Sequence, residues 1–319
     1  MSTKPYLSVV IPVFNREREI RRALDSCLAQ QGADFETIVV DDASSDNSAR
    51  VVEEYAPRGV RLLRQPANLG SSPARVRGIG AALGEWIVRL DSDDELLAGA
   101  LATAQRYALE MPKSVGRIGL SYRYTDGRIS PFPPPGGEVL CYEGIIEWLE
   151  RSETYDCLNI FRLSAIEAVP LPPGRLMEML HNLDFARRFD TVWLPEPGVL
   201  YHVDAVERQS KTLPSKEEAC QSAEEIRLME VRHGKSLRRI APRFYQAQLR
   251  KLTVSRALAG DRIGALREGW SRLRRSNFSM LDCATLFAVA LGRRPLELAL
   301  QVRWRLVEKR RMLLTRPKL

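Results

Sequence analysis

Hydrophobic and polar residues follow two different periods along the first hundred positions. Short apolar runs rich in β-branched residues alternate with segments in which apolar residues recur every three or four positions. The first pattern is typical of buried strands and the second of amphipathic helices. The runs predict strands at 7–14, 35–41, 60–64 and 86–91, and the other segments predict helices at 16–30, from Asp46 toward Tyr55, at 72–83 and at about 97–110. This alternation predicts a mostly parallel sheet covered by helices.

Beyond residue 110 the pattern is less regular. The segment Ser130–Gly137 predicts a loop or lid, because proline removes backbone donors and glycine costs backbone entropy. A predicted helix near Leu176–Phe189 precedes an apolar strand at Thr191–Leu194, and from about Ser215 onward the pattern is helical and increasingly basic. We therefore expect an α/β domain over 1–212 and a helical region over 213–319.

The charge is unevenly distributed along the chain. The 319 residues carry a formal net charge of +8. Residues 1–230 contain 26 Lys and Arg and 35 Asp and Glu, a net charge of −9, whereas residues 231–319 contain 22 basic and 5 acidic residues, a net charge of +17. Such an asymmetry indicates two parts of the chain with different partners.

Cysteine usage and hydropathy restrict the class of protein further. The five cysteines are scattered, odd in number and form no C-x-x-C pair, so neither a disulfide framework nor a zinc site is indicated. The sequence shows no N-terminal targeting pattern and no apolar stretch of about 18 residues that would suggest a membrane-spanning helix. We therefore expect a cytoplasmic protein.

Three carboxylates follow the fourth predicted strand in the turn Asp91-Ser92-Asp93-Asp94. Like charges this close raise one another's pKa, so a bound cation would best explain the ionised cluster. Oxygen-only ligands favour Mg²⁺ or Mn²⁺, and such a cation would hold a diphosphate. Ligands of open α/β sheets bind beyond the carboxyl ends of the strands, which is where this turn lies. The alternative interpretation is a solvated Asp-rich turn.

A second acidic turn, from Asp41 to Asp46, follows the second predicted strand. Its carboxylates could accept a hydrogen bond from a base N–H, which would suit a uracil or thymine ring. Alternatively, Asp41 only ends the strand and Asp46 only caps a helix. The first strand ends in Pro12-Val13-Phe14-Asn15-Arg16, whose backbone groups and guanidinium could serve a nucleotide.

Four segments together resemble the motifs of family 2 glycosyltransferases of the GT-A fold, in the family's order. They are SVVIPVFNRE, IVVDDASSD, Asn68-Leu69-Gly70 with Ala74-Arg75, and VRLDSDDEL. The resemblance covers residues 5–110 well and continues more weakly to about residue 212, where LPEPGVLYH is similar to the end of the catalytic domain. It implies a Rossmann-like, mostly parallel GT-A sheet with flanking helices, with a nucleotide-binding half at 1–110 and an acceptor-side half at 111–212.

The resemblance also implies roles for individual residues. Asp42 would read the base, Arg75 would approach the donor, and Asp91 with Asp93 would bind the metal, Mn²⁺ or Mg²⁺. The whole set implied to bind the nucleotide diphosphate sugar is Pro12, Phe14, Arg16, Asp42, Asn68, Arg75, Asp91 and Ser92.

The catalytic base is the position at which the sequence departs from the family's pattern. The resemblance implies an acidic pair on the helix before LPEPGVLYH, but His181 and Asn182 stand there. Glu178 lies four residues before Asn182, on the same helix face one turn earlier, and is the base that we predict. His181 and Asp184 are the alternatives. With Glu178 taking the acceptor's proton and a metal stabilising the leaving diphosphate, direct displacement would invert the anomeric centre.

The expected function is therefore transfer of a sugar, from a nucleotide diphosphate sugar such as a UDP-sugar, to a hydroxyl of a glycan or lipid-linked acceptor in cell-surface polysaccharide or glycolipid assembly. The alternative, motivated by His181-Asn182, is a catalytically inactive nucleotide-sugar-binding or membrane-associated scaffold protein. A sugar nucleotidyltransferase is disfavoured because no glycine-rich basic N-terminal loop is present, and a dehydrogenase because no G-x-G-x-x-G follows the first strand.

Arginines alternate with apolar residues beyond Val231, which predicts cationic amphipathic helices. The apolar run Met280–Leu291 is too short to cross a bilayer, but it could lie at an interface with Trp270 and Trp304 as anchors. Anionic lipid would attract this region by about 1 kcal/mol per basic residue, which favours a peripheral location at the cytoplasmic face of the inner membrane. Arginines that are only solvated, or that pair with the acidic part of the chain, are the alternative. No nucleic acid is expected as a partner, because no recognised module is present.

Overall fold

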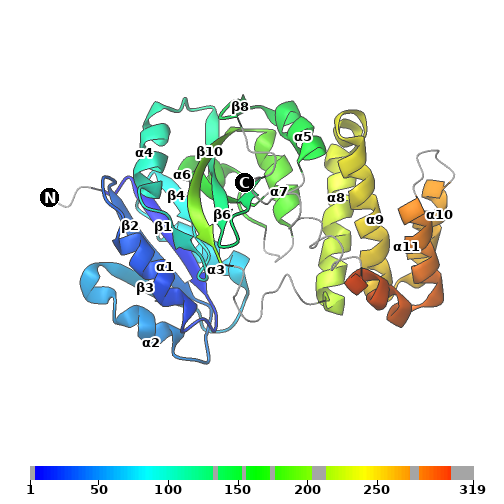
Figure 1. Ribbon diagram of the computed structural model, residues 1–319, viewed down its shortest axis with the longest axis horizontal. Helices are drawn as coiled ribbons and strands as arrows, with labels where there is room; N and C mark the ends of the chain where they lie inside the picture. Colours follow the sequence, from blue (N-terminus) through cyan, green and yellow to red (C-terminus); the bar gives the residue numbers. More distant parts are fainter. Residues whose placement is uncertain are drawn as a thin grey trace. The chain divides into compact units, whose positions relative to one another are not determined.

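The chain forms two compact units in the computed structural model (Figure 1). The structure describes residues 4–131, 136–152, 156–172, 177–202, 213–273 and 280–302. The first unit, called the sheet unit below, comprises Met1–Gly174 and His181–Val206, and the second, called the helical unit, comprises Arg175–Leu180 and Glu207–Leu319. The predicted boundary between residues 212 and 213 adjoins residues 203–212, which lie outside the described residues, so it stays a prediction.

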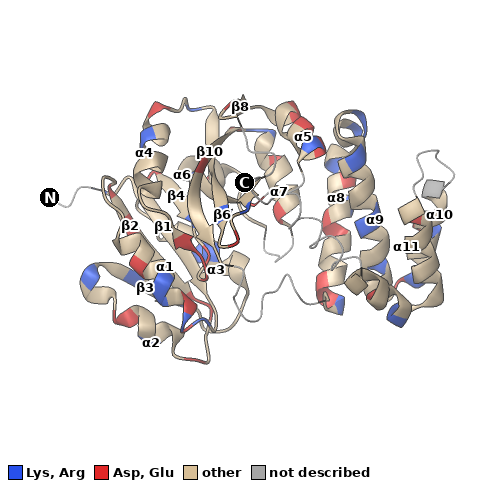
Figure 2. Ribbon diagram, in the orientation of Figure 1, with Lys and Arg blue, Asp and Glu red and all other residues tan. Residues whose placement is uncertain are grey.

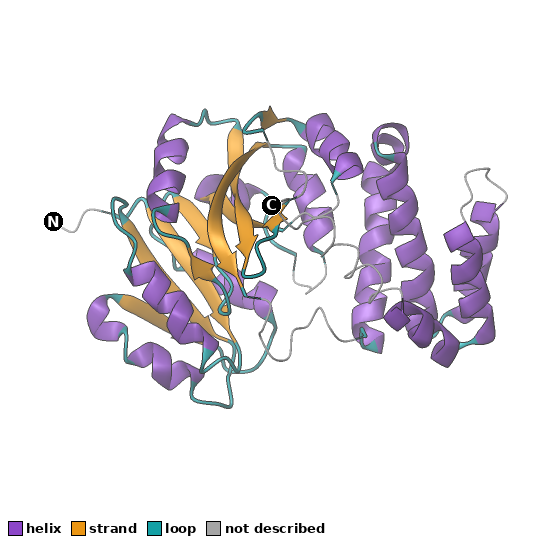
Figure 3. Cartoon of the chain, in the orientation of Figure 1, coloured by secondary structure: helices purple, strands orange, loops and turns teal. Residues whose placement is uncertain are grey.

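A mixed, mostly parallel sheet forms the centre of the sheet unit, as the strand pattern predicts (Figure 3). The strand order is β3-β2-β1-β4-β9-β6-β10-β5, with β7 beside β6 and β8 beside β10. The strands are β1 (Leu7–Val13), β2 (Phe35–Asp41), β3 (Val60–Arg64), β4 (Trp86–Arg89), β5 (Glu95–Leu96), β6 (Val115–Tyr124), β7 (Ile129–Ser130), β8 (Val139–Leu140), β9 (Cys157–Arg162) and β10 (Asp190–Tyr201).

The four N-terminal strands confirm the sequence-based prediction, and β1, β2, β3 and β4 are parallel to one another. The sequence pattern did not predict β9, which lies antiparallel between β4 and β6. The strand predicted at Thr191–Leu194 is longer, because β10 pairs with β6 from Asp190 to Tyr201 through three register shifts. These strands depend on partners far away in the sequence, so the local pattern carries little signal for them.

Helices cover both faces of the sheet. They are α1 (Glu19–Leu28), α2 (Ser48–Glu53), the short 3₁₀ helix η1 (Ala56–Arg58), α3 (Ser71–Gly80), α4 (Ala100–Glu110), α5 (Tyr142–Arg151), α6 (Leu163–Ala168) and α7 (Glu178–Ala186). One core joins alternate strand residues such as Val9 and Val88 to α1 and α4 through Leu24 and Leu101. Because successive strand residues point to opposite faces, the intervening positions form separate apolar clusters with α3, α6 and α7.

The start of α3 differs from the prediction by one residue. Gly70 is the N-cap residue and has φ +98°, a conformation in which glycine avoids the steric cost that a side chain would add. Ser72, which with Pro73 is typical of a helix N-cap and first turn, therefore lies inside the helix, and its hydroxyl donates to the Pro172 carbonyl at 2.8 Å. The predicted loop at Ser130–Gly137 includes residues 132–135, which lie outside the described residues, while Ser130 ends β7.

Within its described residues the helical unit is built from long helices, as the pattern beyond Ser215 predicts. They include α8 (Lys216–Ile240), α9 (Pro242–Leu258), α10 (Arg262–Leu273) and α11 (Met280–Leu291). Ser215 begins α8 with a capping box, in which its hydroxyl accepts from the Glu218 N–H and the Glu218 carboxylate accepts from the Ser215 N–H. In the part of the chain that the structure describes, none of the helices has the length and apolar character needed to cross a membrane.

Candidate active site

The loops that follow β1 and β2 are joined by hydrogen bonds at the carboxyl edge of the sheet. The Asn15 N–H donates to the Ser44 hydroxyl at 3.0 Å, and the Ser45 N–H donates back to the Asn15 side-chain oxygen at 2.8 Å. The Arg16 N–H donates to the Ser48 hydroxyl at 2.8 Å. These hydrogen bonds join the two loops into one surface beside the strand ends. This surface, residues 14–16 and 42–48, is called the ledge below.

Two residues of this ledge have strained backbone. Asn15 has φ +49° and Ala43 has φ +59°, the left-handed region that residues other than glycine rarely adopt. Such strain concentrates at functional sites, where the surrounding contacts maintain it. Phe14, one of the predicted nucleotide residues, is 40% exposed on this ledge, whereas Pro12 is buried within β1.

Asp42 is the buried centre of the ledge, at 2% exposure. Its carboxylate accepts hydrogen bonds from Gln65 Nε2 at 2.8 Å, from the Leu69 N–H at 2.8 Å and from the Gly70 N–H at 2.7 Å. These contacts tie the Asn68-Leu69-Gly70 motif to the end of β2, which the sequence pattern did not reveal. Base recognition by Asp42 stays a prediction, and its observed contacts order the loop that leads into α3.

The acidic turn after β4 adjoins α3 through an ion pair. Arg75 Nη2 lies 2.5 Å from Asp91 Oδ1, and the side chains are 12% and 47% exposed respectively. The sequence singles out both residues, but it does not predict their pairing. Because Asp91 is half exposed while Arg75 is largely covered, the carboxylate can reach a ligand while the guanidinium reduces the local negative charge.

Other side chains of the sheet unit hold the acidic turn in place. Arg22 Nη2 of α1 donates to the Asp93 carbonyl at 2.6 Å, and His202 Nε2 lies 2.7 Å from Glu95 Oε1. Ser92 and Asp94 are buried, at 8% and 1% exposure. Arg22 therefore holds the turn from α1, while His202, which follows β10, lies beside Glu95 directly after the turn.

The phenol of Tyr122, at the end of β6, lies within electrostatic range of the acidic turn. Burial raises its pKa well above the ordinary value, and the carboxylates of Asp94 and Asp91 raise it further. Tyr122 stacks on Tyr201 with ring centroids 5.8 Å apart, and the Tyr124 hydroxyl donates to Asp156 Oδ2 at 3.2 Å. Sequence reasoning missed these residues, because only the pairing of β6 with β10 and β9 brings them to this edge.

The donor set of the acidic turn fits a hard divalent cation. Asp91 and Asp93 offer only oxygen ligands, and Asp91 is half exposed. Across the residues that the structure describes, no three or more His, Cys, Asp or Glu side chains converge to hold an ion by themselves. Mg²⁺ commonly takes one or two carboxylates together with substrate phosphates, and Asp91 with Asp93 would supply that part of its coordination. The metal-binding role of the pair stays a prediction.

The candidates for a catalytic base differ in their surroundings. Glu178 is the first residue of α7, is exposed and belongs to the helical unit, whereas His181 and Asp184 on the same helix belong to the sheet unit. His181 is 3% exposed and packs beside Phe161 and Phe185, with ring centroids 6.3 and 6.0 Å away. His181 is therefore a packed core residue of the sheet unit.

Asn182 has a specific partner in the buried Arg117 of β6. Arg117 Nη1 donates to Asn182 Oδ1 at 2.8 Å, and Arg117 Nε donates to the Thr191 hydroxyl at 3.1 Å. Burial lowers the pKa of Arg117 to about 10, and the guanidinium also lies beside the rings of Phe161 and Trp193. Asn182 therefore helps to hold a buried cation and offers no carboxylate to take a proton.

The sheet order, the ledge and the acidic turn together define an α/β protein of the GT-A class, with the site at the carboxyl edge of the strands. Residues 8–131 match the model of the family described as "Glycosyl transferase family 2". The predicted resemblance is thereby confirmed.

Two relatives show how far the sequence similarity extends. The chain is 43% identical over 90 residues to the succinoglycan biosynthesis protein ExoO of Rhizobium meliloti, covering 28% of this chain and 26% of that protein. It is 39% identical over 109 residues to the GalNAc(5)-diNAcBac-PP-undecaprenol beta-1,3-glucosyltransferase of Campylobacter jejuni, covering 33% of this chain and 35% of the relative. The chain thus matches about a third or less of the length of each.

Solved structures extend the similarity of fold beyond the matched segment. The structure of S. aureus TarS 1–349 in complex with UDP-GlcNAc superposes with a TM-score of 0.57 at 18% identity, covering 89% of this chain and 79% of that one. The mannosyltransferase PcManGT from Pyrobaculum calidifontis, in complex with GDP-Man and Mn²⁺, gives a TM-score of 0.53 at 16% identity, covering 98% of this chain and 88% of that one. At these identities the likeness establishes the GT-A fold.

Proposed function

We propose that this protein transfers a sugar from a nucleotide diphosphate sugar, a UDP-sugar in the first instance, to a hydroxyl of a glycan or lipid-linked acceptor. The observation that carries the proposal is the acidic turn Asp91–Asp94, held beside Arg75 at the carboxyl edge of the sheet. The names of the two relatives, which refer to succinoglycan biosynthesis and to an undecaprenol-linked glycan, support a role in polysaccharide or glycolipid assembly.

The ledge formed by the β1 and β2 loops would bind the nucleoside. Phe14 offers an exposed ring, Arg16 a guanidinium, and the strained backbone at Asn15 and Ala43 fixes their directions. Asp42 would act through the Gln65–Gly70 segment that its carboxylate orders, within which Asn68 is exposed. The base preference is therefore a property of this ledge.

The acidic turn would hold the diphosphate. Asp91 and Asp93 would bind Mn²⁺ or Mg²⁺, and such an ion, when bound, supplies Lewis-acid stabilisation of the negative charge on the leaving phosphate. Arg75 would place a second positive charge beside the same phosphates, and Ser92 would fix the turn between the two carboxylates. Oriented charges of this kind contribute most where charge develops in the transition state.

Glu178 would act as the general base. Its carboxylate would take the proton of the acceptor hydroxyl while the acceptor oxygen bonds to the anomeric carbon and the bond from that carbon to the phosphate oxygen breaks. The nucleoside diphosphate would leave from the opposite face, and a single displacement of this kind inverts the anomeric centre. Glu178 is the first residue of α7.

A thermal-shift measurement with UDP, GDP and dTDP, each with and without Mn²⁺, tests the donor site. Saturation at about one hundred times Kd adds about 2.7 kcal/mol of stability, so the correct nucleotide with Mn²⁺ should raise Tm. Asp93→Ala should abolish the Mn²⁺-dependent part of the shift and lower turnover by about two orders of magnitude or more. The matched control is Asp25→Ala on α1, whose side chain is 60% exposed. Equal responses of the two variants would contradict the metal assignment.

A second candidate function is a nucleotide-sugar-binding protein without transferase activity. The observation that favours it is the pair His181-Asn182, in which one residue is buried and the other is bonded to Arg117. Turnover of a panel of UDP-sugars, either to a glycan acceptor or to water, separates the two candidates. If the protein binds the nucleotide sugar but shows no turnover, and if Glu178→Gln leaves that binding unchanged, the second candidate function is favoured.

A further inference from the structure

The outer face of α11 is an uninterrupted apolar surface. The exposed fractions are 91% for Met280, 66% for Phe287 and 56% for Leu291, and Leu281 is 39% exposed. Cys283, Ala284 and Ala290 are exposed as well. Residues 280, 284, 287 and 291 lie three or four positions apart, so they form one stripe along the helix, called the α11 stripe below.

The only charged residue of α11 is Asp282, and Figure 2 distinguishes the charged residues of the chain from all others by colour. Asp282 is 7% exposed, and its carboxylate lies 3.5 Å from Arg250 Nη1 of α9. Leu286 and Val289 are buried, and Val289 belongs to an apolar cluster with Leu258 of α9 and Ala265 of α10. The helix therefore has an ordinary buried face, and a second apolar face that packing within the described residues does not cover.

Arginines surround the C-terminal end of the α11 stripe. Arg262 Nε donates to the Val289 carbonyl at 3.0 Å, and its guanidinium also bonds the Ala290 carbonyl, so a cation caps the end of the helix. Arg293 and Arg294 follow Gly292 and are exposed, and Arg293 Nε lies 2.7 Å from Glu297 Oε1. They belong to residues 231–319, which carry a net charge of +17. An apolar face with a cationic border is typical of helices that lie in a membrane interface.

We propose that the α11 stripe docks on an anionic lipid surface, with Met280, Phe287 and Leu291 inserted at the boundary between headgroups and acyl chains. Twelve residues are too few to span a bilayer, so the helix would lie in the plane of the membrane. Arg293 and Arg294 would contact the headgroups. Charge favours this occupant over a second copy of the chain, because two cationic helical units repel each other whereas an anionic surface attracts them.

This interaction goes beyond the proposed function and does not depend on it. Docking needs neither a donor nor the acidic turn, so it can be measured with the full chain and vesicles alone. A protein that binds vesicles without sugar-transfer activity would retain the docking inference and lose the proposed function. A protein with sugar-transfer activity that does not bind vesicles would retain the proposed function and lose the docking inference.

The first test is sedimentation of the full chain with vesicles of phosphatidylglycerol and phosphatidylcholine. Phe287→Asp should weaken binding by about tenfold or more, because it removes a large apolar side chain that would insert into the membrane and places a charge in the interface. The matched control is Val231→Asp on α8, which makes a similar change at an apolar residue of the same unit that is 82% exposed. Control binding should equal that of the unchanged protein. Equal binding by all three proteins would overturn the proposal.

The second test places an environment-sensitive thiol probe on Cys283, with Cys141 and Cys220 changed to serine. Burial raises the pKa of the Cys27 thiol to about 12 and of the Cys157 thiol to about 11, so these two do not compete for the label. Emission should shift to the blue with anionic vesicles and be quenched by lipids labelled within the acyl region. A probe on Cys220 of α8, with Cys283 changed to serine, is the control. A Cys283 shift that appears without lipid, from self-association or from residues 303–319, would overturn the proposal.

Discussion

Single residues at the strand ends differ in how much of their role the sequence reveals. Asp91 and Asp93 stand out in sequence because three carboxylates in one turn are electrostatically costly, and the structure adds the partner, Arg75. Asp42 stands out equally, but its three hydrogen bonds reach back from residues 65–70 and follow from no local pattern. The observed role of Asp42 is therefore loop organisation, which was not part of the sequence-based hypothesis.

At this scale we predict that Asp42→Asn destabilises the protein by about 1 to 3 kcal/mol. One carboxylate oxygen becomes an NH₂ group, which cannot accept and would face an N–H donor in a buried position. Urea unfolding measures the change. Asp25→Asn, on an exposed side chain 3.6 Å from Arg58, should change stability by less than about 1 kcal/mol. Equal losses of unfolding free energy in the two variants would show that the buried hydrogen bonds of Asp42 stabilise the protein no more than an exposed ion pair does.

Among the secondary-structure elements, α7 carries the predicted base, Glu178, at its first residue. Its first turn belongs to the helical unit and its remaining residues belong to the sheet unit. Glu225 of α8, 3% exposed, accepts hydrogen bonds from the Met179 N–H at 3.0 Å and the Leu180 N–H at 3.3 Å. A carboxylate at a helix N-terminus satisfies free donors and complements the helix dipole. The helical unit therefore helps to build the helix turn that carries the predicted base, Glu178.

Glu225 also makes the stability of the protein depend on pH in a way that can be measured. Burial raises its pKa above the ordinary value for glutamate, and the charge of Glu178 raises it further, while Lys251 and the two N–H groups oppose these effects. The unfolded chain therefore releases this proton at lower pH than the folded chain. Stability falls as the pH rises from the ordinary glutamate pKa to the raised pKa, and the contribution is constant above it.

We predict that Glu225→Gln removes this part of the pH dependence while keeping one acceptor oxygen for the cap. Glu225→Ala removes the cap and should cost about 1 to 2 kcal/mol. Urea unfolding from about pH 4 to about pH 8 follows both effects. The neighbouring Glu224 is exposed, so Glu224→Gln is the matched control and should leave the profile unchanged. If the free energy of unfolding of Glu225→Gln depends on pH as strongly as that of the unchanged protein, Glu225 is not the titrating group.

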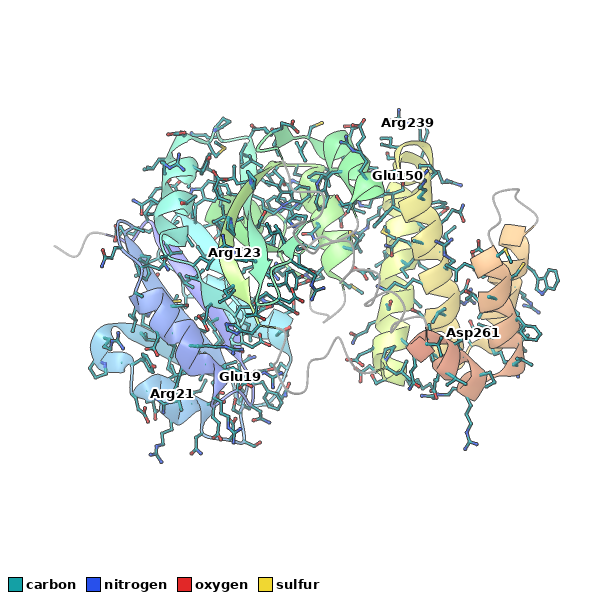
Figure 4. All side chains as sticks on the ribbon, in the orientation of Figure 1. Glu19, Arg21, Arg123, Glu150, Arg239 and Asp261 are labelled. Atoms are coloured by element: carbon teal, nitrogen blue, oxygen red, sulfur yellow. The ribbon has the colours of Figure 1, made fainter. Side chains whose placement is uncertain are left out.

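Across the whole molecule, charge and apolar surface should make separable contributions to membrane binding. Residues 231–319 carry a net charge of +17, while the α11 stripe carries none on its outer face. Figure 4 shows side chains of both units and labels Arg123 at the end of β6 and Arg239 in the last turn of α8. Electrostatic attraction is screened by salt, whereas the apolar contribution is not.

We predict that the double substitution Arg293→Glu and Arg294→Glu weakens binding to phosphatidylglycerol vesicles by at least about 2 kcal/mol and reduces its salt dependence. Phe287→Asp should weaken binding while keeping most of the dependence on salt. Vesicle titrations at several salt concentrations distinguish the two effects. Arg123→Glu in the sheet unit, at an exposed residue, serves as the control. Identical salt slopes in all variants would rule out a contribution of Arg293 and Arg294.

The sequence by itself determined the parallel β1–β4 half of the sheet, the acidic turns at the strand ends and the helical character of the region after Ser215. These features follow from local periodicity, caps and strand-end polarity, which each segment carries alone. Only the tertiary structure decided the insertion of β9 between β4 and β6, the pairing of Arg75 with Asp91, the division of α7 and the outward face of α11. Each of these depends on residues far apart in the sequence, whose proximity is set by packing of the whole chain and not by any local pattern.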